Sequence, residues 1–367
     1  MIVEINRSKR CLSIYFLYIT ICVISNFLYG NPFSTKGQFW ASGLTGNDVP
    51  AEQSAYESTF GYIPTLSLYQ DLSDFSFVDF EWAYRLDRFY SGYSLVSNRE
   101  KIHRLWARYS SEKLEARLGL QKIVFGPSQI LRTLSWFDTI DLKDPTNQTD
   151  GVEAFRLKWF PSNAISIWSW AIQNEQDTVS FGGRVELSSF LGELGFTFHS
   201  DPSETVQQVG QLGFMISERH QRFAFDIRHD GFVGSWLETA FITSENTDIK
   251  MATIGADYTV AISNGLLIMT ESMFVKNAES DDQTFTAFMA MLPLGMIHSI
   301  MFISQIDWKE DRAYNYLRWS ATFDQFSLNL ILSQSPQRSD YSIAEEYLPK
   351  TVAGFGSGIQ FMFIYNH

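Results

Sequence analysis

The sequence predicts an all-β fold: a single transmembrane antiparallel β-barrel of 16–18 strands, preceded by a cleaved signal peptide. Three observations lead to this prediction. Polar and apolar residues alternate from about residue 36 to the end, as they do in strands with two different faces. Aromatic residues make up 16% of the chain, yet the mean hydropathy is only −0.10. The N-terminus has the composition of an export signal.

The first 30 residues form the predicted signal peptide. A basic start comes before an apolar run, with Arg7, Lys9 and Arg10 followed by residues 11–30. An uncleaved anchor is the alternative, since about 18 apolar residues can span a bilayer. We favour a signal peptide because no other apolar block follows. Both cysteines, Cys11 and Cys22, fall in this segment, so the predicted mature chain has no thiol for a disulfide or a metal.

The strands of the predicted mature chain, residues 31–367, are long and have two contrasting faces. In VDFEWAYRLD (78–87), one face is Val, Phe, Trp, Tyr and Leu, and the other is mostly charged. A soluble sandwich would also alternate, but soluble strands usually run about 5–6 residues. Transmembrane strands need about 9–11 residues, with lipid on one face and a wet lumen on the other. A closed barrel also satisfies every backbone donor, which lipid cannot do.

Nineteen segments qualify as strands, and single-chain bacterial barrels have an even number. We therefore predict 16–18 strands and no separate plug or soluble domain. The segments begin near residues 37, 59, 75, 103, 113, 152, 164, 178, 191, 205, 220, 233, 249, 265, 282, 295, 312, 327 and 352.

The last segment, GSGIQFMFIYNH, supports the barrel independently. Steps of two back from His367 give Tyr365, Phe363, Phe361 and Ile359. This alternation resembles the terminal strand of Gram-negative outer-membrane barrels, which the barrel assembly machinery recognises. The usual final residue of that strand is Phe, where this chain has His367.

The longest predicted loop, residues 126–151, contains Trp136, Phe137 and four aspartates, namely Asp138, Asp141, Asp144 and Asp150. A divalent-cation site is one interpretation, but the chain lacks the D-x-[DN]-x-[DN]-G pattern of a calcium loop. We predict solvated acids and turn formers, and no metal or cofactor. His199 and Asp201 are the best candidates for a catalytic pair, but histidines at strand ends are more often simply solvated. We therefore predict no catalytic residue and no enzyme.

Basic residues are prominent on the predicted lumen face, although the chain carries a net charge of −13. That charge argues against a nucleic-acid partner. Charges that line a pore select ions or small charged solutes, and anions are slightly favoured because most of the excess acid lies in loops. Pairing of these charges with one another is the alternative. The candidates are Arg85, Arg104, Arg108, Arg117, Arg156, Lys158, Arg184, Arg222 and Arg228.

The segment from Arg117 to Val152 resembles porin-type outer-membrane proteins, with the alginate-export and phosphate-porin-like groups nearest. R-L-G-L-Q (117–121), Phe125-Gly126, a long loop and Asp150-Gly151-Val152 carry the resemblance. Leu120 stands where the family pattern has arginine. The resemblance implies that Arg117 and Gln121 line the lumen, that residues 127–150 constrict or cap it, and that the protein is a homotrimer.

These inferences predict a porin in the outer membrane of a Gram-negative bacterium. It would lie in outer-membrane lipid and let small, preferentially anionic solutes diffuse through a charged lumen. An export conduit and a non-conducting structural or enzymatic barrel are the alternatives.

Overall fold

The structure, a computed structural model, describes residues 32–174, 177–209, 214–277 and 280–367. The predicted signal peptide, residues 1–30, lies outside the described residues. Within them, no helix is both long and apolar enough to cross a membrane.

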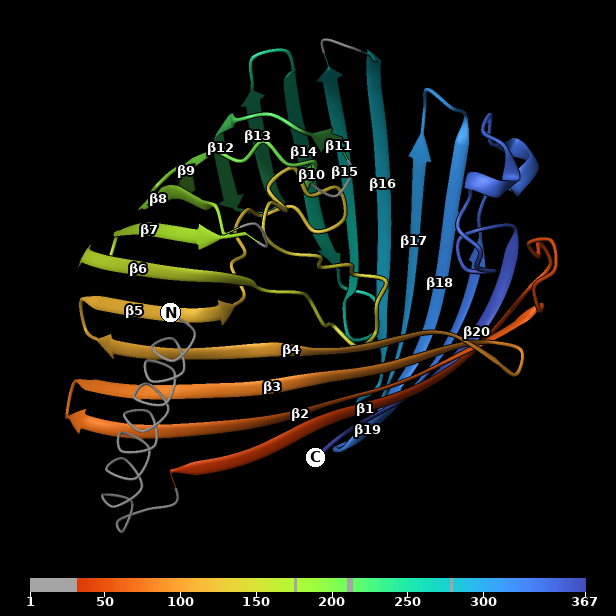
Figure 1. Cartoon of the computed structure of the whole chain (residues 1–367), viewed down its shortest axis with the longest axis horizontal. Coiled ribbons are helices and arrows are strands. Elements are labelled where there is room, and N and C mark those ends of the chain that lie inside the picture. The colour runs from red at the N-terminus through yellow and green to blue at the C-terminus, as the bar shows by residue number, and fades with distance from the viewer. Residues whose placement is uncertain (1–31, 175–176, 210–213, 278–279) are drawn as a thin grey trace, which may run out of the picture.

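Eighteen antiparallel strands form one closed barrel (Figure 1). Consecutive strands pair with each other, β9 pairs with β12, and β20 closes the ring on β1. The barrel strands are β1 (Phe33–Gly46), β2 (Tyr56–Ser73), β3 (Ser76–Ser91), β4 (Ser94–Ser111), β5 (Leu114–Gln121), β6 (Val152–Ser162), β7 (Ile165–Gln173), β8 (Val179–Ser189), β9 (Gly192–Asp201), β12 (His220–Asp230), β13 (Gly234–Thr243), β14 (Asp248–Val260), β15 (Leu266–Asn277), β16 (Ser280–Leu294), β17 (His298–Asp307), β18 (Arg312–Thr322), β19 (Phe326–Gln334) and β20 (Ser357–Asn366).

The prediction of a single antiparallel barrel with 16–18 strands is confirmed at eighteen. The segment expected to begin near residue 205 is not a wall strand, so this part of the prediction was wrong. It forms a separate two-stranded hairpin, β10 (Gln207–Val209) with β11 (Phe214–Ile216). Each of these strands is only three residues long, too short to cross a bilayer.

The outer wall carries the large apolar side chains. Leu118 is 63% exposed, and Phe181 and Phe361 are exposed by about half. On β20, Ile359 and Phe361 point outward while Met362 and Ile364 are buried inside. This is the phase expected from the sequence. A closed wall with this exterior is suited to lipid.

The two edges of the barrel differ in their connections. At one edge, every turn from β2–β3 to β18–β19 is at most five residues long. The three longest connections all leave the other edge, and they are residues 122–151, 202–219 and 335–356. The last of these contains two 3-10 turns, η1 (Arg338–Asp340) and η2 (Glu345–Tyr347).

The connection between β5 and β6, here called the inner loop (residues 122–151), enters the lumen instead of extending outward. Figure 1 shows it in yellow inside the ring of strands. Its apolar residues Ile123, Phe125, Leu134 and Trp136 are buried in the main hydrophobic cluster, together with inward-facing residues of the wall. The core of this barrel is therefore built by the loop and the inner wall together.

Candidate functional site: the lumen crossed by the inner loop

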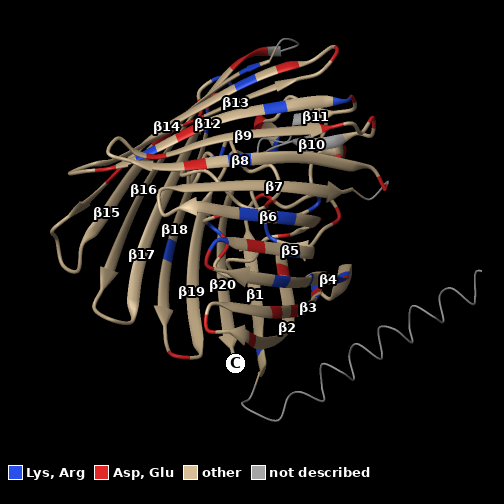
Figure 2. Cartoon of the chain, turned by 90° about the vertical axis from the view of Figure 1, so that its left-hand side faces the viewer, with Lys and Arg blue, Asp and Glu red and all other residues tan. Residues whose placement is uncertain are grey.

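A row of basic side chains lines the inner wall on β4, β5 and β6. Arg108, Arg117 and Arg156 are direct register partners on these three strands. Lys158 follows on β6 with Glu115 as its partner on β5. Figure 2 shows the basic and acidic segments on neighbouring strands of this wall. We call Arg108, Arg117, Arg156 and Lys158 the basic cluster.

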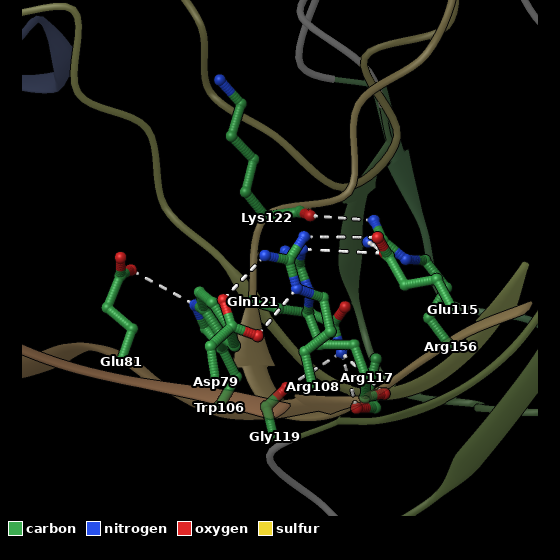
Figure 3. A network of polar contacts seen from close by, with 11 residues as sticks. Asp79, Glu81, Trp106, Arg108, Glu115, Arg117, Gly119, Gln121, Lys122 and Arg156 are labelled. Carbon is green, nitrogen blue, oxygen red and sulfur yellow. Dashed lines mark hydrogen bonds and ion pairs between the residues drawn. The ribbon is translucent and has the colours of Figure 1, made fainter. Parts of the chain in front are cut away.

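Two carboxylates, Asp79 and Glu115, hold the three arginines of the basic cluster together (Figure 3). Arg108 Nε and Nη2 donate to Asp79 at 2.8 and 2.7 Å, and its Nη1 donates to Glu115 at 3.3 Å. Glu115 also accepts from Arg156 Nη2 at 2.7 Å and lies 3.7 Å from Arg117 Nη2. Three arginines thus share two carboxylates. Like charges placed side by side on a sheet repel each other and destabilise it. Because the carboxylates only partly compensate these cations, the electrostatic potential beside this part of the wall is positive.

Tryptophan rings supply the remaining support. The Arg117 guanidinium lies 4.4 Å from the centroid of the Trp106 ring, and Lys158 Nζ lies 3.3 Å from that of Trp168. Such cation–π contacts stabilise a charge without neutralising it. Neither tryptophan was predicted as a site residue. The sequence pattern that could have identified them is a tryptophan at an inward-facing position of a strand, since contact with lipid cannot account for a tryptophan there.

Three of the other predicted lumen residues are neutralised by their own acids. Arg184 donates to Asp226 at 2.6 and 2.9 Å and also to Glu186. Arg85 donates to Asp87 at 2.7 Å. Arg228 donates to Asp230 and Asp257 at 2.8 and 3.0 Å. These pairs follow the paired-charge alternative, and they contribute little to the net potential of the lumen.

Two predicted arginines have no acidic partner within 4 Å among the described residues. Arg104 donates to the backbone carbonyls of His103 and Thr149. Arg222 is 3% exposed, donates to His220 Nε2, and lies over the Trp136 ring at 5.7 Å. Arg104 therefore holds the inner loop, and Arg222 supports the loop aromatic residue from the wall.

Gln121, the last residue of β5, is fully buried where the chain turns into the inner loop. Its side-chain amide donates to the carbonyls of Arg117, Gly119 and Ala154. It lies on the inward phase of β5, but it joins β5 to β6 instead of facing open lumen.

The four loop aspartates each have a local partner. Asp138 forms a buried ion pair with Arg132. Asp141 accepts the backbone N–H of Lys143, and Asp144 accepts that of Thr146, which are turn-forming bonds. Among the described residues, no group of three or more His, Cys, Asp or Glu side chains could hold a metal ion.

Asp150 fixes the end of the inner loop to β4. It forms ion pairs with Arg99 at 2.7 Å and Lys101 at 2.9 Å. Burial alone would raise the pKa of Asp150, but the hydrogen bond and charge of Lys101 and the charge of Arg99 outweigh it. The pKa of Asp150 therefore lies below its ordinary value of 3.8.

The inner loop crosses the lumen from β5 to the far wall. Lys143 Nζ donates to Gln305 of β17 at 3.1 Å, and the Tyr316 hydroxyl of β18 donates to the Lys143 carbonyl at 2.7 Å. The strand order places β17 and β18 across the ring from β5 and β6. On its way back, Gln148 donates to Gln38 of β1 at 2.8 Å.

The loop aromatic residues pack against the wall between these crossings. Phe125 meets Trp136 edge-on at 5.6 Å and stacks on Trp170 of β7 at 5.9 Å. Phe137 meets the His199 ring at 4.9 Å. His199 Nδ1 accepts a bond from Trp170 Nε1, while Asp201 accepts the Ser203 N–H. His199 and Asp201 thus have separate structural partners.

Two cavities border the inner loop. One, of about 750 Å³, is lined by Trp136, Phe137, His199 and Arg222 among others. The other, of about 310 Å³, lies between β1, β3, β4 and Gln148 of the loop, and Arg104 lines it. Free space in the lumen therefore lies beside the loop.

No protein-family model matches the sequence, and no curated protein matches it. Solved structures do. Pseudomonas aeruginosa OpdK, solved with vanillate, superposes with a TM-score of 0.60 at 8% identity over 91% of this chain and 98% of that one. Acinetobacter baumannii OccAB1 gives 0.58 at 7% identity over 91% and 96%. Pseudomonas aeruginosa OccD3 gives 0.57 at 7% identity over 91% of both chains. The chain therefore has the fold of Gram-negative outer-membrane porins.

Proposed function

We propose that the protein is a porin of the outer membrane of a Gram-negative bacterium, through which small solutes diffuse passively. The observation that carries this proposal is the closed barrel whose lumen is crossed by a loop and bordered by cavities. An apolar exterior and a charged interior are what lipid outside and water inside require. The proposed function needs no chemistry beyond diffusion.

The basic cluster favours anionic solutes. Asp79 and Glu115 balance only part of the charge of its four cations, and Arg104 adds a fifth cation with no acid within 4 Å among the described residues. A local excess of positive charge at the wall raises the concentration of anions beside it. Selectivity is modest, because Arg184 and Arg228 are neutralised by neighbouring acids.

Planar lipid bilayers test the channel function. We expect the purified, folded protein to give stable, single-channel current steps. The second candidate function is a non-conducting structural or enzymatic barrel, and it is favoured by the apolar cluster that the inner loop builds inside the lumen. Folded protein that inserts into the bilayer and stays silent would support that candidate and contradict a porin.

Selectivity gives a second prediction. Neutralising Arg104, Arg108 and Arg117 together to Gln should shift the reversal potential toward cations in a salt gradient. Asp79 and Glu115 would then balance the two cations that remain, Arg156 and Lys158, so the local excess of positive charge would be lost. Arg88→Gln is the matched control. Arg88 pairs with Glu100 on the outer face, opposite Phe60. An unchanged reversal potential in the triple variant would eliminate the anion preference.

Assembly completes the proposal. Residues 1–30 direct export and are removed, β20 presents Ile359, Phe361, Phe363 and Tyr365 to the barrel assembly machinery, and the mature chain forms a homotrimer in outer-membrane lipid. Native mass spectrometry of the protein purified from membranes gives the start of the chain and the number of copies in one measurement. A monomer of the full 42.1 kDa chain would contradict both the cleavage and the trimer.

A further inference from the structure

Six backbone N–H groups of the inner loop donate to just two side chains of the opposite wall. Glu238 accepts from Ser128, Thr133 and Leu134 at 2.8, 3.0 and 3.3 Å. Glu271 accepts from Gln129, Ile130 and Leu131 at 2.7, 3.0 and 2.6 Å. All four carboxylate oxygens are used. The partners are 104–142 residues apart in the sequence.

The two glutamates lie on β13 and β15, and the strand between them joins the contact. Thr253 of β14 donates to the Leu131 carbonyl at 3.0 Å and shares a 2.7 Å hydrogen bond with Thr133. Gly126, at φ +91°, begins this segment, and a Cβ there would collide with Glu238 Oε1. Residues 126–134 therefore fit closely against three adjacent strands.

The burial and the hydrogen bonds of these two carboxylates indicate that their role is to bind the inner loop. Glu238 is 1% exposed and Glu271 is fully buried, and neither has a cation within 4 Å in the described part of the chain. Burying a charge without compensation is costly, whereas charge-assisted bonds from backbone N–H groups offset that cost. Here every such bond comes from the inner loop. If the loop left the wall, both carboxylates would lose their donors together.

We propose that Glu238 and Glu271 are positioning residues that fix the inner loop across the lumen and so determine the cross-section of the channel. This inference rests on the proposed porin function for its effect on current, although the anchoring of the loop does not depend on conduction. A carboxylate is needed, because it only accepts hydrogen bonds. A glutamine amide would direct its own N–H groups at the loop donors.

A spin label on the loop tests the anchor directly. Cys11 and Cys22 are the only cysteines and lie in the predicted signal peptide, so Gln129→Cys is the single thiol of the exported chain. Gln129 is exposed, while its backbone N–H is held by Glu271. In the Glu238→Gln, Glu271→Gln double variant, we expect the mobile component of the label spectrum to change from minor to major. Fluctuations of the open-channel current should increase in the same variant.

The matched control is Glu57→Gln. Glu57 is another buried inward glutamate, and it accepts bonds from Thr351 and Val352 of the 335–356 connection. It should leave both the label at 129 and the current fluctuations unchanged. If the double variant does not fold, as judged by loss of resistance to SDS before heating, Gly126→Ala displaces the same contact from the loop side and leaves the wall intact.

The outcomes separate the anchor from the channel. An immobile label in the double variant and in Gly126→Ala overturns the anchor, whatever the conductance. If Glu57→Gln mobilised the label at position 129 equally, the anchor would also be overturned, because losing any buried glutamate would then loosen the inner loop. A mobilised label in a protein that never conducts supports the anchor and rejects the porin.

Discussion

The basic residues of the lumen differ in how tightly acids hold them. Arg108 is held by two bonds to Asp79, whereas the nearest contact of Arg117 with Glu115 is 3.7 Å and its face is covered by Trp106. A weakly held cation is the one best able to meet a passing anion. We therefore expect Arg117 to contribute more to selectivity than Arg184, which two acids hold.

Asp150 shows how a single residue couples the inner loop to pH. Its pKa lies below the ordinary 3.8 in the folded protein, so its ion pairs stabilise the fold fully above that value. The stabilisation is lost as the pH falls through the lower, folded pKa. The side chains are about a third exposed, so Asp150→Asn should cost about 1 kcal/mol or less at neutral pH.

Thermal unfolding of both proteins across pH measures this contribution. The melting temperature of Asp150→Asn should be lower than that of the wild type at neutral pH, and this difference should disappear in strong acid. Asp141→Asn is the control, because Asp141 caps a turn and has no cation within 4 Å among the described residues. If the melting temperature of Asp150→Asn stayed equally far below that of the wild type in strong acid, the lost stability would not come from the ion pairs.

At the scale of elements, the unequal lengths of β4 and β5 explain the path of the inner loop. β4 has 18 residues and β5 only 8, and they pair only over Leu105–Ser110 of β4. Because β5 stops partway up the wall, the chain turns inward there. The half of β4 that β5 does not reach then supplies Arg99, Lys101 and Arg104 to hold the returning loop.

The outer face of β5 should tolerate apolar substitutions but not charged ones. Leu118 points outward and is 63% exposed, so Leu118→Arg should destabilise the barrel by about 2–4 kcal/mol if it lies at the bilayer midplane. Leu118→Phe is the apolar control and should change little. Urea unfolding in lipid vesicles measures both variants. Equal stability of Leu118→Arg and the wild type would mean that this face of the wall does not meet lipid.

At the scale of the whole molecule, different parts of the chain close the barrel and fill its interior. Closing eighteen strands into a ring gives every strand a paired neighbour on each side and leaves no edge strand, as lipid requires. A ring of this size is too wide for its own side chains to fill. The inner loop supplies the missing core, and it leaves cavities beside it that a solute can occupy.

The sequence by itself determined the wall of this barrel. Alternation with a period of two is imposed locally, because each strand has lipid on one face and the lumen on the other. That pattern gave the antiparallel barrel, the phase of β20 and the position of the longest loop, although β5 ends at Gln121 and the loop begins four residues earlier than predicted. The one strand that it misplaced, near residue 205, alternates too briefly to cross a membrane.

Tertiary structure alone decided what fills the lumen. Contacts such as Ser128 with Glu238 or Lys143 with Gln305 join residues more than 100 positions apart. A local period cannot say which strands of a closed ring lie opposite each other, nor which arginine meets which acid. Glu238 and Glu271 therefore look in the sequence like any inward polar residue. Their role depends on a loop that reaches them only once the ring has closed.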